Sequence, residues 1–272
     1  MKKLLVVAIL LLAVLLSRAY LSRHETVRLG GSRGLMSPMQ ELAAVYAAKN
    51  SSERVEVLAD DVESLDGIQA TQEGRIAVGL TARTLRADEE ASLQYHAIGR
   101  IPIVAVVPST LPVESLTQAQ LCDVFAGRTT SWRALGGPDE KIMVATRKEG
   151  DTIKRAVRAR LACFRTLQET RAAFVPATDQ GLQQALSRVA VIGFATLDFV
   201  RRSEGRVKAL ALTSVTPSAE SVRDGSYPLF QEVGLVTRGV PSGLAHRFLE
   251  FVATPEGARV LDRHGIVLAS AL

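Results

Sequence analysis

Two segments of the sequence offer backbone N–H groups to a negatively charged ligand. In each, a short apolar run ends in a glycine-containing turn and a helical pattern follows, over residues 30–37 and 147–152. The amides at a helix N-terminus lack intrahelical acceptors and lie at the positive end of the helix dipole, so they bind oxyanions. Arg147 adds a guanidinium that can donate two parallel hydrogen bonds to phosphate or sulfate. These residue types indicate oxyanion binding.

We expect the ligand contacts on three loops that each follow a strand, because ligands of α/β sheets collect at the carboxyl ends of strands. Two loops would supply backbone amides, one of them with Arg147 as the main cationic contact, and Thr81 would supply a hydroxyl. The candidate ligand-binding residues are Ser32, Arg33, Gly34, Leu35, Thr81, Arg147, Gly150, Asp151 and Thr152.

The residue patterns of common hydrolases are missing from the sequence. It has no Gly-x-Ser-x-Gly elbow, no His-Glu-x-x-His and no cysteine pair at metal-site spacing. The four histidines, His24, His96, His246 and His264, are far apart and show no ligand spacing. We therefore expect a protein that is not an enzyme, with no catalytic residue, metal or cofactor.

Short apolar strands alternate with amphipathic helices along most of the chain, which predicts an α/β fold. The expected strands are residues 26–29, 55–58, 76–80, 98–107, 142–145, 191–195 and 229–236. The expected helices are residues 64–73, 117–125, 152–164, 180–187, 244–253 and 255–264. A further helix after the first strand is expected to begin with Ser37 as N-cap and Pro38 as its first residue.

Two long apolar runs, residues 98–107 and 229–236, are typical of central strands buried on both faces. The sequence between them has helices and strands of its own, so the chain is expected to leave one lobe, build another and return. The predicted division is residues 26–103 with 223–272 for lobe one, and 104–222 for lobe two.

The N-terminus, residues 1–25, predicts a signal peptide or an N-terminal anchor. Lys2 and Lys3 precede thirteen apolar residues, and Ser17-Arg18-Ala19 offers a cleavage site. The apolar run is shorter than the ~20 residues of a membrane-spanning helix. Arg18 leaves an uncleaved anchor open, which would be the only membrane attachment. We expect a periplasmic or secreted protein.

The charge of the chain gives no reason to expect a nucleic-acid partner. Its net charge is +5, and Lys2, Lys3 and Arg18 supply three of these charges. The remainder, about +2, is scattered among acidic residues.

An exported chain would expose Cys122 and Cys163 to an oxidising compartment, where two thiols can pair. Both are expected in helices of lobe two. Two separate, buried and reduced cysteines are the alternative.

Several motifs resemble the phosphate-binding proteins of bacterial ABC transporters, within the type II periplasmic solute-binding family. The most specific stretch is residues 112–139, which holds a leucine-threonine helix start, Phe125-Ala126-Gly127, Trp132 and Gly136-Gly137. The remaining matches follow in the family's order, at residues 78–83, 146–150, 190–195, 227–229 and 251–257. The resemblance implies two lobes with two hinge crossovers, phosphate or a related oxyanion in an interlobe cleft, an ABC permease as partner, and ligand contact by Arg147.

The candidate site departs from the family pattern. Where the family usually has Ser-Gly-Thr, this chain has Asp151-Thr152-Ile153, and only Thr81 remains of two hydroxyls after the third strand. A carboxylate about 4 Å from a ligand charge repels it by roughly 4 kcal/mol at an effective dielectric of 20. Asp151 would therefore either accept the proton of a protonated phosphate, which sulfate lacks, or serve as a helix N-cap. The N-cap is the preferred interpretation.

Two functions stay open on these residues. The first is a transport protein that delivers phosphate or a related oxyanion. The second is a sensor or regulatory protein that reuses the fold with a degenerate site.

Overall fold

The computed structural model describes residues 25–58, 64–176, 178–187 and 190–268, so the predicted signal lies outside the described residues apart from its last position. The chain forms two compact units. The first takes the chain up to Thr81, Leu85–His96 and Leu235–Val260, and the second takes Ala82–Thr84, Ala97–Gly234 and the chain from Leu261. This confirms the predicted two-lobe α/β fold.

Two long strands contribute to both units, as the apolar runs predicted. They are β4 (Gln94–Pro108) and β10 (Phe230–Thr237), and the chain passes between the units after His96 and after Gly234. The predicted lobe boundaries, after residues 103 and 222, stay a prediction.

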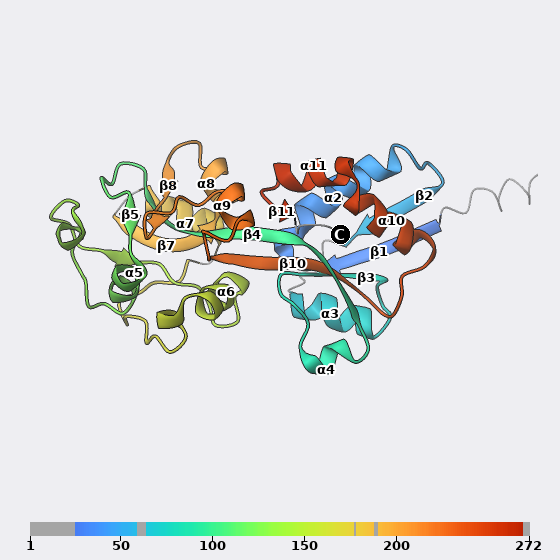
Figure 1. Cartoon of the computed structure of the whole chain (residues 1–272), viewed down its shortest axis with the longest axis horizontal. Helices are drawn as coiled ribbons and strands as arrows, with labels where there is room; N and C mark the ends of the chain where they lie inside the picture. Colours follow the sequence, from blue (N-terminus) through green and yellow to red (C-terminus); the bar gives the residue numbers. More distant parts are fainter. Residues whose placement is uncertain (1–24, 59–63, 177, 188–189, 269–272) are drawn as a thin grey trace, which may run out of the picture. The chain divides into compact units, whose positions relative to one another are not determined.

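The first unit is built on a parallel sheet. Its central strand β1 (Glu25–Gly31) pairs with β2 (Glu53–Val57) on one side and with β3 (Val78–Thr81) on the other. The helices are α2 (Arg33–Ala47), α3 (Ser64–Gln72), α4 (Ala87–Glu90), α10 (Gly243–Ala253) and α11 (Pro255–Arg263), which continues into the second unit. Figure 1 shows α2, α10 and α11 on one face of this sheet and α3 on the other.

Glycines bring α3 into direct contact with the backbone of the sheet. A Cβ atom added to Gly67 would lie 2.6 Å from the Gly31 Cα and 2.8 Å from the Gly30 carbonyl oxygen. Gly31 itself has a φ of +136°, and a Cβ there would lie 2.2 Å from the Leu80 carbonyl oxygen. Residues 30 and 31 belong to strand β1 rather than to the glycine-containing turn that was predicted.

We expect Gly67→Ala to lower the free energy of unfolding by about 2 kcal/mol, because the added methyl group overpacks a contact with rigid backbone. Gly181→Ala is the matched control, since Gly181 also lies in a helix but its added Cβ would come no closer than 3.6 Å to a neighbour. That control should be neutral or slightly stabilising, because alanine favours helix over glycine. Equal urea midpoints for the two variants would contradict the close contact.

Helix α2 begins earlier than the sequence predicted. Ser32, not Ser37, is its N-cap, and Pro38 lies inside the helix. The Ser32 amide donates to the Leu80 carbonyl oxygen at 2.9 Å, which fixes the helix start directly after β1. Pro38 removes one hydrogen bond near the beginning of the helix and does not prevent the earlier turn.

Helix α10 contacts β1, β2 and α2, which come some two hundred residues earlier in the sequence. The Arg247 guanidinium pairs with Glu25 at 2.6 Å and with Glu53 at 2.7 Å, and the rings of Phe248 and Tyr46 meet edge to face at 5.5 Å. The hydrogen bonds that Arg247 donates to Glu53 and then to Glu25 raise the pKa of Arg247 above its ordinary value. The first unit therefore depends on residues far apart in the sequence.

The second unit mixes antiparallel and parallel pairing. Strand β4 pairs antiparallel with β7 (Val191–Thr196), which pairs in parallel with β6 (Met143–Val144). The other strands are β5 (Ser115–Leu116), β8 (Val207–Ala209), β9 (Ala211–Leu212) and β11 (Val267–Leu268). The helices are α5 (Gln118–Phe125), η1 (Trp132–Leu135), α6 (Thr152–Arg160), η2 (Ala162–Phe164), α7 (Asp179–Leu186), α8 (Leu197–Arg202) and α9 (Ala219–Arg223).

Aromatic side chains fill the core of the second unit. The rings of Phe125 and Phe194 stack at 4.8 Å, and Phe164 meets both edge to face. Trp132 is fully buried, and its indole N–H donates to the Ala190 carbonyl oxygen at 3.0 Å. The motif residues of the sequence, Phe125 and Trp132, are therefore core residues.

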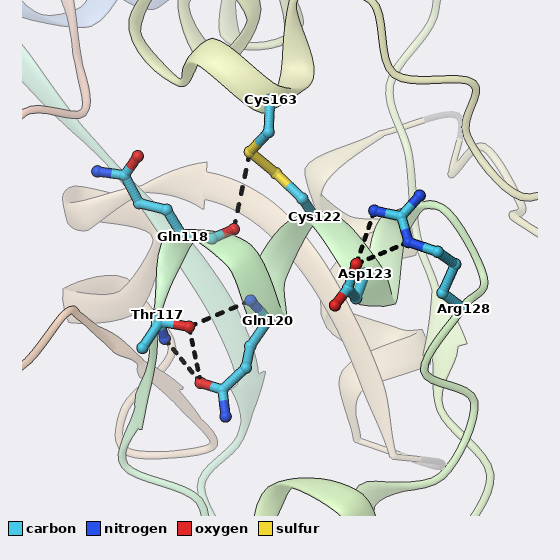
Figure 2. Close-up of a disulfide and its surroundings, with 7 residues drawn as sticks. All are labelled: Thr117, Gln118, Gln120, Cys122, Asp123, Arg128 and Cys163. Atoms are coloured by element: carbon cyan, nitrogen blue, oxygen red, sulfur yellow. Dashed lines mark hydrogen bonds and ion pairs between the residues drawn. A yellow bond between two sulfur atoms is a disulfide. The ribbon is translucent and has the colours of Figure 1, made fainter.

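A disulfide joins Cys122 in α5 to Cys163 in η2, with Cα atoms 6.3 Å apart (Figure 2). Cys122 is buried and Cys163 is exposed. The predicted helix over residues 152–164 is interrupted at Leu161, which has an extended backbone, so Cys163 lies in a short 3-10 turn. Of the two states left open by the sequence, the structure has the bridged one.

Within the residues described above, no helix combines the length and the apolar character needed to cross a membrane.

Candidate functional site

The structure brings the predicted ligand-binding residues together in two groups, one in each unit. Ser32, Arg33, Gly34, Leu35 and Thr81 belong to the first unit. Arg147, Gly150, Asp151 and Thr152 belong to the second. In the first group, residues 32–35 follow β1 and Thr81 ends the neighbouring strand β3. The second group follows β6.

In the first group, several of the predicted donors are used within the protein. The Ser32 amide donates to Leu80, and the Leu35 amide donates to the Ser32 carbonyl oxygen at 2.9 Å. Thr81 is the last residue of β3 and is fully buried. The amide of Gly34 lies in the first helical turn, where N–H groups lack the acceptor four residues earlier that the helix interior provides. The first helical turn, rather than a loop before it, is the feature that this group offers to an anion.

In the second group, Arg147 is held by its own unit. Its Nε and Nη2 donate to the Phe194 carbonyl oxygen at 3.2 and 2.9 Å, and its Nη1 pairs with Asp179 at 3.0 Å. The side chain is only 14% exposed. Arg147 is rigidly placed, but its charge is already balanced by a carboxylate.

Asp151 is the N-cap of α6. Its Oδ1 accepts hydrogen bonds from the amides of Ile153 at 2.8 Å and Lys154 at 3.2 Å. The Asp151 amide in turn donates to the Lys148 carbonyl oxygen at 3.2 Å, and Gly150 adopts a φ of +86° that permits the turn. The carboxylate thus occupies amides at the helix N-terminus that an oxyanion would otherwise use.

The buried side chain of Lys154 binds the backbone of this turn. The Lys154 ammonium donates to the Arg147 carbonyl oxygen at 3.1 Å and pairs with Glu169 at 3.0 Å and Glu149 at 2.7 Å. Its side chain is 9% exposed, and Glu169 also accepts the Thr146 hydroxyl at 2.5 Å. Lys154 therefore fixes the backbone position of Arg147.

The charges around this turn largely balance one another. Hydrogen bonds from Arg158 and Lys154 lower the pKa of Glu149 to about 2, so Glu149 is ionised at neutral pH. Arg147 pairs with Asp179, and Lys154 pairs with Glu149 and Glu169. Arg158 pairs with Glu149 as well. Asp151 caps the helix, and Lys148 is exposed. An anion arriving at this turn finds little surplus positive charge.

The cavity beside Arg147 is too small for a phosphate. It measures about 10 Å³ and is lined by Thr146, Arg147, Lys154 and Glu169 among others. That volume is close to the minimum for a single water molecule. A ligand of the second group would bind on the surface of the turn.

Sequence reasoning missed three partners of the second group. Lys154 stands three residues after the helix cap, a position that carried no signal of its own. Glu169 and Asp179 come from a loop and from the start of α7. Their spacing from Arg147 in the sequence is irregular, so only the fold reveals them.

Among the described residues, no group of three or more histidine, cysteine, aspartate or glutamate side chains is arranged to hold a metal ion.

Comparison with known proteins places these observations in a family. A family profile described as "PBP superfamily domain" matches residues 19–256. The phosphate-binding protein PstS of Bacillus subtilis is 22% identical over 249 residues, which cover 85% of this chain and 76% of that protein. The phosphate-binding protein PstS 2 of Streptococcus pneumoniae (strain TIGR4) is 31% identical over 115 residues, which cover 42% of this chain and 39% of that protein.

Solved structures with the same fold match most of the chain. One is described as a phosphate ABC transporter substrate-binding protein of Clostridium perfringens with bound phosphate. It has a TM-score of 0.78 and 22% identity and covers 90% of this chain and 100% of its own. Another is an ABC-type phosphate transport receptor of Vibrio cholerae, with a TM-score of 0.74, 21% identity and coverage of 89% and 100%.

Proposed function

Because the chain belongs to the PBP superfamily, we propose that it is an exported solute-binding protein that holds phosphate or a related oxyanion for an ABC-type phosphate transporter. The observation that carries the proposal is the two-unit α/β fold, in which β4 and β10 contribute to both units. The turn after β6, where Arg147 precedes α6, is the candidate ligand contact. Relatives named phosphate-binding proteins support phosphate as the ligand. The protein would work by binding, without catalysis.

Location and partner follow from the same proposal. The basic and apolar N-terminus would export the chain to the periplasm or the exterior, with an uncleaved signal as the only membrane anchor. A permease of the ABC type would receive the ligand.

One observation favours a second function, a sensor or regulatory protein with a degenerate site. Asp151 occupies amides of α6, and Asp179 neutralises Arg147. Both carboxylates oppose an incoming oxyanion, so a chain with this turn could keep the fold and bind its ligand weakly.

Calorimetric titration of the wild type and of Asp151→Ser with phosphate and with sulfate tests the proposal. Serine is itself a favoured N-cap, so the variant keeps the helix start and loses only the charge. We expect the wild type to bind phosphate, and the variant to bind both anions at least tenfold more tightly, which corresponds to about 1.4 kcal/mol.

Two other results of the titration would assign a different role to Asp151 or contradict the transport proposal. If the variant loses a preference for phosphate over sulfate without tighter binding, Asp151 accepts the proton of the phosphate. If neither protein binds either anion at millimolar concentration, the transport proposal is wrong and the second function is favoured.

A further inference from the structure

Two arginines lie against one buried phenylalanine in the second unit. The guanidinium carbon of Arg160 is 3.4 Å from the centre of the Phe230 ring, and that of Arg100 is 4.4 Å from it. Arg160 is the last residue of α6, Arg100 comes from β4, and Phe230 begins β10. Three elements thus bring two cations to one place.

These cations have few acceptors in the protein. Each guanidinium carries five N–H groups. Within the described part of the chain, Arg160 bonds to the Glu232 carboxylate at 3.4 Å and Arg100 bonds to the Val222 carbonyl oxygen at 3.5 Å. Both contacts are at the long limit of hydrogen bonding, so most of the donors have no partner among the residues that the structure describes.

The two guanidinium groups also repel each other. Their separation cannot exceed the sum of their distances to the shared ring, and the Arg160 side chain is only 28% exposed. Burial, and then the charge of Arg100, lower the pKa of Arg160, whereas Glu232 raises it. Glu232 pairs with Arg160, and no carboxylate among the described residues is paired with Arg100, so the cluster keeps a surplus positive charge.

Ordinary structural roles account for one arginine but not for the pair. A cation at a helix C-terminus is favourable, which explains Arg160, and one guanidinium over an aromatic face is a common contact. A second guanidinium at the same ring adds repulsion. An anion that accepts hydrogen bonds from both would remove that repulsion.

We propose that Arg100 and Arg160 together bind a tetrahedral oxyanion, with Phe230 holding the two guanidinium groups in place. Each guanidinium can direct a parallel pair of N–H groups at oxygen atoms about 2.8 Å away, so one oxyanion can be shared by both. Arg147 differs, since the Phe194 carbonyl and Asp179 already take its donors. The choice of phosphate as the ligand rests on the proposed function.

The test is calorimetric titration of the full chain with phosphate, using wild type, Arg100→Gln, Arg160→Gln, Arg160→Lys and Arg147→Ala. Arg133→Gln is the matched control, because Arg133 is an exposed arginine of the same unit with one exposed partner, Asp139. We expect each glutamine variant at Arg100 or Arg160 to weaken binding at least tenfold, and the control to change it less than twofold. Arg160→Lys should lose less phosphate affinity than Arg160→Gln, because lysine keeps the positive charge although it lacks the paired N–H donors of arginine.

A wild type that binds phosphate while Arg100→Gln and Arg160→Gln bind within twofold of it would overturn this inference and leave the proposed function intact. In that case, a loss confined to Arg147→Ala would identify Arg147 as the cationic contact. If Arg160→Gln does not fold, the comparison of Arg160→Lys with wild type decides.

A wild type that binds no phosphate contradicts the proposed function, and sulfate then decides the inference separately. Sulfate that raises the unfolding temperature of the wild type and not that of Arg160→Gln supports the two-arginine site. Equal shifts in both proteins, or none, reject it.

Discussion

Reduction of the bond between Cys122 and Cys163 is expected to lower the free energy of unfolding by about 4 kcal/mol, by the loop-closure relation for a 41-residue separation. The bridge ties the turn that follows α6 to α5, beside the Thr117 cap of α5 (Figure 2). Without it, the unfolded chain gains conformational freedom while the aromatic core stays packed. Urea unfolding with and without a reductant measures the difference.

The control is the double variant Cys122→Ala with Cys163→Ala, whose unfolding a reductant should leave unchanged. Thiol titration of the denatured, unreduced wild type should find no free thiol. Two free thiols, or equal sensitivity of wild type and double variant to the reductant, would contradict the bridge.

Replacing Lys154 with methionine is expected to lower the free energy of unfolding by about 3 kcal/mol, because it leaves the Glu169 carboxylate buried without its cation. Lys154 is 9% exposed and Glu169 is 16% exposed. The same change removes the donor that holds the Arg147 carbonyl oxygen. Phosphate affinity should therefore fall together with stability.

Two comparisons separate this loss from a general effect of removing charge. Arg133→Met breaks an exposed pair and should change stability by less than about 1 kcal/mol. Adding Glu169→Leu to Lys154→Met removes the uncompensated charge and should restore part of the stability. If Lys154→Met and Arg133→Met unfold at the same urea concentration, the buried network does not stabilise the turn.

Periodicity and composition predicted most of the fold. The long apolar runs correspond to β4 and β10, and the helix predicted over residues 117–125 corresponds to α5, with Thr117 as its N-cap. These features are local, so neighbouring residues determine them. The start of α2 was misplaced because the hydrogen bond from Ser32 to Leu80 outweighed the cap signal at Ser37.

The candidate site was predicted only in part. Asp151 as a helix cap follows from its position before Thr152, and the structure confirms it. The pairing of Arg147 with Asp179 does not follow from local sequence, since α7 reaches Arg147 only through the packing of the second unit. The meeting of Arg100 with Arg160 was hidden for the same reason.

The closure of the first unit by α10 has a consequence for how the molecule assembles. Arg247 must bind Glu25 and Glu53, yet it is made some two hundred residues later than either, as the sequence separation of 222 from Glu25 records. A chain that emerges from its N-terminus presents β1 and α2 long before Phe248 arrives to cover Tyr46. Most of the second unit, Ala97–Gly234, is continuous and emerges in that interval. The unit that is synthesised first is therefore completed only after most of the second unit has emerged, and residues 25–96 are exposed to misassembly during that interval.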